Sequence, residues 1–144
     1  MVSYNIDFIS DEDFIKHANK LAEAYKRSAL SISKDGFFSN SIDPFKFSFD
    51  TKIFGKEVAI KNELMRQFDK TVNNAIGEFH QEILGSVTGW EDLGRGSEYG
   101  VDLENAQENL YIELKNKYNT MNSSAASSVK KKLLNILSIN KEAK

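Results

Sequence analysis

The chain has 144 residues, 40% of them hydrophobic and 28% charged, a balance that fits one folded globular domain and excludes a disordered or membrane-embedded chain. Its formal net charge of −2 excludes a globally basic surface for nucleic acid, so any such contact needs a local basic patch. The absence of cysteine excludes disulfides, thiolate nucleophiles and cysteine-based zinc sites, and without a signal peptide or membrane-spanning run we expect a cytoplasmic protein.

The first predicted helix begins after Ser10, a favourable N-cap residue. Its first turn carries the acidic residues 11–13, where the helix dipole favours negative charge. Apolar residues at helical spacing extend this helix to about Leu30. His17 lies one turn after Asp13, so we expect a surface pair between these two side chains.

The next segment, from Phe37 to Gly55, contains the only proline, Pro44. Three phenylalanines in it alternate with polar residues: Phe45, Phe47 and Phe49. This period of two predicts a short extended stretch. Its aromatic face either caps the core, which we favour, or forms a contact surface for a partner.

A long helix is predicted next, because apolar residues recur every three or four positions as far as Gly85. These residues are Ile60, Leu64, Phe68, Val72, Ile76, Phe79 and Ile83. Glu78 and Glu82 share a helix face outside this stripe, and His80, beside it, fits either a buried or a functional histidine. Five glycines between Gly85 and Gly100 then predict a loop.

Two short segments after this loop, Val101–Glu104 and Leu110–Lys115, alternate apolar and polar residues and predict two antiparallel strands joined by a turn. The register that matches apolar side chains opposes Asn105 to Leu110, Leu103 to Ile112, and Val101 to Leu114. In this register Asp102 faces Glu113. A slip of one residue would oppose apolar to polar side chains, so the pattern itself brings the two carboxylates together.

Asp102, Glu113 and Lys115 together suit the hydrolysis of a phosphodiester. Two carboxylates supply the oxygen ligands that Mg²⁺ prefers. A metal held there polarises the phosphate and lowers the pKa of a bound water. Lys115 points to the same side as Glu113 and can orient the water or stabilise charge on the phosphate. The alternative is a solvated hairpin face, and the spacing alone does not decide between the two.

The string Gly100-Val101-Asp102, followed after ten residues by Glu113-Leu114-Lys115, resembles the PD-(D/E)XK nuclease motif. A longer likeness is more specific. The runs 111–124 (YIELKNKYNTMNSS), 79–85 (FHQEILG) and Gly89-Trp90 resemble type II restriction endonucleases that cut GGNCC-like sites. The resemblance covers the chain roughly from Phe8 to Leu137.

This resemblance implies Mg²⁺-dependent cleavage of double-stranded DNA by a homodimer, with Asp102 and Glu113 as metal ligands and Lys115 as the catalytic lysine. Such nucleases often take a further carboxylate from a helix, and of Glu78 and Glu82 we favour Glu82. A cognate DNA methyltransferase is the expected genetic partner. Val101 replaces the proline that often precedes the first acid. Enzymes of this family are longer, so we expect a C-terminally truncated domain.

A local basic patch follows the second acid, because residues 114–140 contain five lysines and no acidic residue. Near the carboxylates we expect DNA contacts from Arg95, Lys117, Asn119, Asn122 and Ser123. For residues 130–132, three consecutive lysines, an ordinary exposed helix face is an equal alternative.

A last helix is predicted with Ser123 or Ser124 as its cap. Its apolar side would carry Ala126, Val129, Leu133 and Leu137.

These features predict a single α/β endonuclease domain over residues 1–144. We expect a restriction-endonuclease-like core in which helices flank a small mixed sheet with the D…ExK hairpin at its centre. The predicted function is site-specific DNA cleavage in a restriction-modification system. One alternative is a catalytically inactive DNA-binding remnant or subunit of such an enzyme, and another is an unrelated helical interaction protein.

Overall fold

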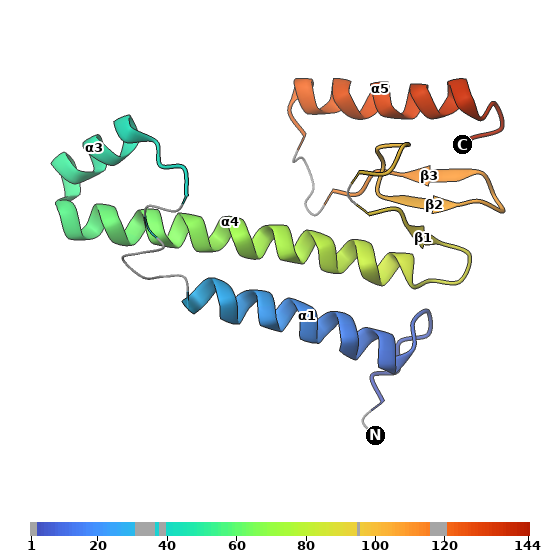
Figure 1. The fold of residues 1–144 in the computed structure, drawn as a ribbon, viewed down its shortest axis with the longest axis horizontal. Coiled ribbons are helices and arrows are strands. Elements are labelled where there is room, and N and C mark those ends of the chain that lie inside the picture. Colours follow the sequence, from blue (N-terminus) through green and yellow to red (C-terminus); the bar gives the residue numbers. More distant parts are fainter. Residues whose placement is uncertain (1–2, 31–36, 38–39, 95, 116–120) are drawn as a thin grey trace. The chain divides into compact units, whose positions relative to one another are not determined.

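The computed structural model describes residues 3–30, 37, 40–94, 96–115 and 121–144, and the structural statements below concern these residues. The elements in chain order are α1 (Asp11–Leu30), α3 (Pro44–Phe54), α4 (Lys56–Gly85), β1 (Glu91–Asp92), β2 (Leu103–Asn105), β3 (Leu110–Ile112) and α5 (Ser123–Ile139) (Figure 1). The chain divides into two compact units: a first unit of residues 1–18 with 77–144, and a second unit of residues 19–76. None of the described helices combines the length and apolar character needed to cross a membrane.

The expected bounds of the first and the long helix are confirmed by α1 and α4. Ser10 caps α1: its hydroxyl accepts a hydrogen bond from the Asp13 N–H at 3.0 Å and donates one to Asp13 Oδ2 at 2.7 Å. At the end of α4, a Cβ atom on Gly85 would lie 2.7 Å from the Cβ atom of Asp92. Glycine at this position therefore allows β1 to approach the end of the helix.

Residues 44–54 form a helix, α3, so the expected extended stretch is wrong. Asp43 is the N-cap and accepts hydrogen bonds from two backbone N–H groups of the first turn, each at 3.0 Å. Pro44 occupies the first turn, where its missing N–H is not needed. Gly55 ends the helix with a φ of 86°. These start and stop signals outweigh a period of two that spans only five residues.

The phenylalanines of α3 divide between the two sides of the helix. Phe47 packs against Phe37 with a ring-centroid distance of 5.5 Å. Phe45 and Phe49, four residues apart, are exposed. A half-buried phenylalanine two positions from each of two exposed ones therefore arises in a helix as well as in a strand.

The three strands form an antiparallel sheet in the order β1-β2-β3. The predicted pairs Leu103–Ile112 and Asn105–Leu110 are confirmed. The expected loop contains β1, a two-residue strand that pairs with β2. A short strand of this kind is stabilised by its neighbour and leaves little pattern of its own in the sequence.

The predicted mixed sheet is wrong, because the described strands pair only antiparallel. Beside β3, the single residue Lys144 makes two backbone bonds without forming a strand. Lys144 donates its N–H to the Asn109 carbonyl at 2.8 Å, and its carbonyl accepts from the Tyr111 N–H at 3.3 Å. Lys144 therefore bonds to both neighbours of Leu110, which is the hydrogen-bond pattern of two parallel segments. The strands themselves are joined by connections too short for a parallel crossover, so they pair antiparallel.

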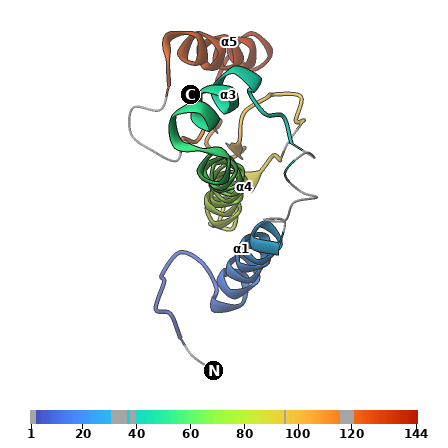
Figure 2. The same ribbon diagram turned by 90° about the vertical axis from the view of Figure 1, so that its left-hand side faces the viewer.

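The core of the first unit lies on the two faces of this sheet. The sheet lies between α5 and the last turns of α4 in Figure 1, and again in Figure 2. Val101, Leu103 and Ile136 are each at most 2% exposed. The buried side of α5 includes Ile136, whereas Leu137, on the predicted apolar side, is 43% exposed. The real buried stripe of α5 is therefore rotated from the predicted one.

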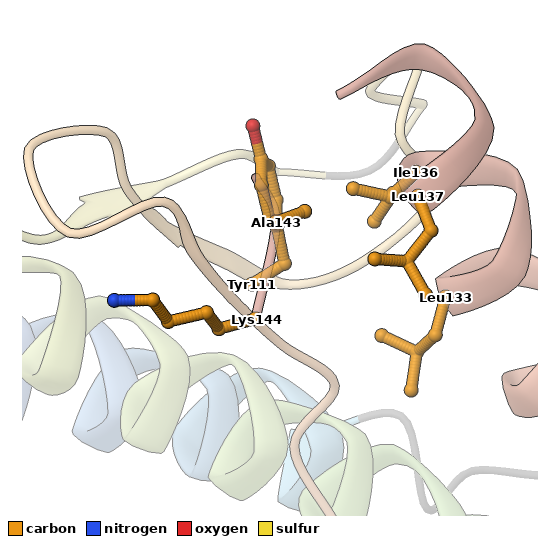
Figure 3. Close-up of a pocket in the computed structure, with 6 residues that line it drawn as sticks. All are labelled: Tyr111, Leu133, Ile136, Leu137, Ala143 and Lys144. Carbon is orange, nitrogen blue, oxygen red and sulfur yellow. The ribbon is translucent and has the colours of Figure 1, made fainter. Parts of the chain in front are cut away.

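An apolar cavity of about 250 Å³ opens between α5 and the edge of β3. Figure 3 shows Leu133, Ile136 and Leu137 of α5 directed toward Tyr111 and the last two residues of the chain. Among the residues that the structure describes, no acidic side chain lines this cavity. The cavity therefore belongs to the packing of α5 on the sheet and not to the predicted acidic site.

Candidate active site

Asp102 is held immediately before β2 by bonds from three directions. Its backbone N–H donates to the Ile112 carbonyl at 3.0 Å, which connects it to β3. Its carbonyl accepts from the Leu93 N–H at 3.0 Å and from Gln81 Nε2 at 3.2 Å. Its carboxylate atom Oδ2 accepts from the Leu114 N–H at 2.7 Å. The carboxylate position is therefore determined by the backbone of both neighbouring strands and by α4.

Asp102 bonds to the residues that flank Glu113, outside the regular ladder of β2 and β3. The ladder of β2 and β3 ends at Leu103–Ile112. Beyond it, Asp102 bonds to the two residues on either side of Glu113. The Leu114 N–H is thus taken by the Asp102 side chain, and the expected ladder pair of Val101 with Leu114 is not part of the sheet.

Glu113 is an enclosed member of the predicted acidic site, with a side chain only 9% exposed. Its two carboxylate oxygens contact two different lysines. Lys115 Nζ lies 2.7 Å from Oε1, and Lys132 Nζ lies 2.9 Å from Oε2. A solvated hairpin face, the alternative reading of the sequence, does not describe a carboxylate in this position.

The charge state of Glu113 follows from these contacts. Burial by itself raises the pKa of the Glu113 carboxyl, but hydrogen bonds and charge attraction from Lys115 and Lys132 outweigh burial and leave the pKa below its usual value. Glu113 is therefore an ionised, hydrogen-bonded carboxylate near neutral pH. Such a group is ready to act as an anionic ligand or as a charged contact.

Lys132 is the site residue that the sequence reasoning missed. It is one of three consecutive lysines, for which the sequence leaves DNA contact and an ordinary exposed face as equal alternatives, and Lys130 and Lys131 are exposed. Lys132 lies three residues after Val129 and four before the buried Ile136, so it shares their face of α5. A single lysine placed on the apolar stripe of a helix was the signal available in the sequence.

Gln81 and Asp92 form a second layer behind Asp102 that the sequence reasoning also missed. Gln81 Nε2 donates to Asp92 Oδ1 at 2.7 Å as well as to the Asp102 carbonyl. The same Asp92 oxygen accepts from the Gly94 N–H at 2.8 Å. Gln81 therefore links α4, β1 and the residue before β2, and it positions the Asp102 backbone.

Glu82, the third predicted metal ligand, contacts a histidine in this structure. Glu82 Oε2 lies 2.9 Å from His17 Nδ1, and the other ring nitrogen of His17 lies 3.1 Å from Ser86 Oγ. The expected surface pair of His17 with Asp13 is wrong, because the His17 side chain is only 12% exposed and Asp13 bonds to the cap of α1. Among the described residues, no group of three or more histidine and acidic side chains is placed to hold a metal.

Of the predicted DNA contacts, Arg95, Lys117 and Asn119 lie outside the described residues. Asn122 and Ser123 lie at the start of α5 and are exposed. The N-cap is Asn122, not Ser123 or Ser124: its Oδ1 accepts from the Ala125 N–H at 2.8 Å. Asparagine caps a helix as well as serine does, so composition alone did not separate them.

The arrangement can supply anionic oxygen ligands beside ammonium groups. Mg²⁺ in proteins is commonly bound by one or two carboxylates together with substrate phosphates. Asp102 and Glu113 therefore suffice chemically without a third acid. Lys115 and Lys132 add positive charge at the same place, which suits a phosphate more than a neutral substrate.

Comparison with known proteins gives a consistent result. The sequence model described as Eco47II restriction endonuclease matches residues 6–144 of the chain. The chain is similar to the Type II restriction enzyme Eco47II of Escherichia coli, with 41% identity over 117 residues, which is 81% of this chain and 48% of that protein.

A second relative is the Type II restriction enzyme Sau96I of Staphylococcus aureus, with 33% identity over 135 residues, covering 92% of this chain and 51% of that protein. The chain thus spans about half the length of the curated relatives it matches. No solved structure matches it.

Proposed function

Because the chain belongs to the Eco47II restriction endonuclease family, we propose that it cleaves double-stranded DNA at a specific site as a type II restriction endonuclease. The observation that carries the proposal is the enclosed Glu113 carboxylate with an ammonium group on each oxygen, beside the backbone-held Asp102. A cluster of this kind fits a phosphodiester and a divalent cation.

In this proposal Asp102 and Glu113 would hold Mg²⁺, which when bound would polarise the scissile phosphate and lower the pKa of a water molecule. Lys115, whose Nζ lies 2.7 Å from Glu113 Oε1, would stabilise the negative charge that grows on the phosphate as the water attacks. Gln81 keeps the Asp102 backbone in place. Glu82 is not included among the ligands, since its Oε2 contacts His17.

The proposed substrate is a GGNCC-like site in double-stranded DNA, read by a homodimer whose two-fold axis matches the palindrome. Arg95, Lys117, Asn119 and the exposed Ser123 are the proposed DNA contacts. We place the activity in the cytoplasm, beside a methyltransferase that protects the host DNA. These assignments rest on the family resemblance and on the basic character of residues 114–140.

The test is digestion of a plasmid that carries GGNCC sites by the purified full chain. Parallel reactions contain Mg²⁺, a chelator, or Mg²⁺ with the Lys115→Ala variant. We expect discrete fragments only in the first reaction. Removal of one group that stabilises developing charge typically slows an enzyme by on the order of a hundredfold to a thousandfold.

Lys131→Ala serves as the matched control. Lys131 is exposed on α5, and its replacement by alanine removes the same charge as Lys115→Ala does. Intact plasmid at high protein concentration would contradict cleavage by this chain. Salt-sensitive retention of DNA without cutting would then support the alternative, a DNA-binding subunit or remnant. Loss of cutting in Lys131→Ala equal to that in Lys115→Ala would remove the assigned role of Lys115.

A further inference from the structure

Two lysines contact Glu113, and only one of them lies near it in the sequence. Lys115 lies two residues away in the chain, whereas Lys132 reaches the carboxylate from α5, 19 residues away. Each lysine contacts a different oxygen, at 2.7 Å and 2.9 Å. Both oxygens of a carboxylate that is proposed to bind metal are therefore already engaged by protein ammonium groups.

The position of Lys132 is determined by packing and is not that of a loose surface side chain. It shares a helix face with Ile136, which is 1% exposed and anchors α5 on the sheet. Its side-chain carbons Cγ, Cδ and Cε lie 3.9–4.0 Å from the place where Gly100 would carry a Cβ atom. The bare glycine leaves space beside the lysine stem, just before Asp102.

We propose that Lys132 is a positioning residue that occupies Glu113 Oε2 while the metal is absent and releases this oxygen to the incoming divalent cation. This inference rests on the proposed function, since it takes Glu113 to be a metal ligand. An oxygen within 2.9 Å of an ammonium group is shielded from a second cation by charge repulsion, so the two compete for it. Lys115, on the other oxygen, need not move.

The exchange also explains how the enclosed Glu113 carboxylate stays able to bind a metal ion while none is bound. A carboxylate that is only 9% exposed is costly to leave unpaired. Lys132 supplies the missing charge and hydrogen bond, and its single ammonium group is joined to a flexible stem that can withdraw. Lys132 therefore weakens metal binding slightly while it keeps Glu113 ionised and correctly directed.

The test measures Mn²⁺ binding to the full chain by electron paramagnetic resonance, without DNA and without cleavage. Mn²⁺ is suitable because it prefers oxygen ligands, as Mg²⁺ does. The variant is Lys132→Met, which removes the charge and keeps a similar stem. The matched control is Lys131→Met, an equal change of charge one residue earlier on α5. We expect Lys132→Met to bind Mn²⁺ roughly threefold to fivefold more tightly than the control, the value of a partly exposed ion pair.

Lys132→Arg, which retains the charge, should not reproduce this gain. In a Glu113→Gln background the further change Lys132→Met should have no effect, since the competition acts through Glu113. Equal or weaker binding by Lys132→Met than by Lys131→Met would overturn the inference while leaving the metal site intact. Absence of Mn²⁺ binding in the wild type and all variants would overturn both the inference and the proposed metal ligands. Lys132→Gln replaces Lys132→Met if thermal melting shows that the latter does not fold.

Discussion

Two glutamates, one in each unit, are almost completely withdrawn from solvent but are neutralised in different ways. In the second unit Glu63 is 6% exposed, and Arg66 and Gln67 of the same helix bond to it at 2.6–3.0 Å. In the first unit Glu113 is 9% exposed, and its partners are two lysines from different elements. Both glutamates have a pKa below the usual value.

The difference lies in how the partners are supplied. Arg66 and Gln67 stand three and four residues after Glu63, so the contact forms when α4 forms. Arg66 approaches with two nitrogens of one rigid guanidinium, which holds both carboxylate oxygens at once. Lys132 reaches Glu113 only after α5 packs on the sheet. A bidentate pair within one helix suits a structural role. Two separate ammonium groups suit a site at which the carboxylate exchanges its partners.

The largest expected contrast is in DNA cleavage. Glu113→Gln keeps the size of the side chain but removes the charge that the metal and the two lysines need. We expect plasmid cleavage to fall by at least about a hundredfold, with Glu63→Gln within about threefold of wild type. Gel-based initial rates at saturating Mg²⁺ measure both variants. Equal losses in the two variants would break the distinction between a functional and a structural carboxylate.

A smaller contrast is expected in stability. Arg66→Ala leaves Glu63 buried with a hydrogen bond from Gln67 but without the guanidinium, so we expect the free energy of unfolding to fall by roughly 1–3 kcal/mol. Urea denaturation followed by circular dichroism measures this change. Lys26→Ala is the control, because Lys26 and Glu23 form an exposed pair at the same spacing, and no measurable change is expected there. A comparable loss in the control would show that burial of Glu63 is not the cause.

The smallest expected effect is a dependence on pH. Hydrogen bonding from Arg66 lowers the pKa of Glu63 in the folded protein, so ionised Glu63 stabilises the fold above its ordinary pKa of 4.5. That contribution disappears as the pH falls from 4.5 through the lower folded value. The stability difference between wild type and Glu63→Gln should therefore be constant above about pH 4.5 and narrow below it. Urea denaturation across this range checks the sign, and a difference that widens in acid would contradict it.

Glu113 should show the same sign, because its pKa is also lowered. A narrowing of the difference between wild type and Glu113→Gln in acid would confirm that the lysines outweigh burial. The two glutamates then differ in function and not in the direction of their titration.

Local patterns were sufficient for much of the first unit. Ser10 and Gly85 mark the ends of α1 and α4 as expected, and matching of apolar residues placed Leu103 opposite Ile112. The pairing of Asp102 with Glu113 stays a prediction, since the regular ladder ends at Leu103 and Ile112. Alternation failed for α3, where three phenylalanines were too few to outweigh the Asp43 cap and Pro44.

The sequence by itself therefore determined the family, the bounds of α1, the end of α4 and the register of β2 on β3, because each depends on spacing along the chain. Only the tertiary structure decided which distant side chains complete the site. Lys132 on Glu113, Gln81 behind Asp102 and His17 on Glu82 join residues 19, 21 and 65 positions apart. Such contacts arise when separate elements pack against one another, and no period within one element encodes them.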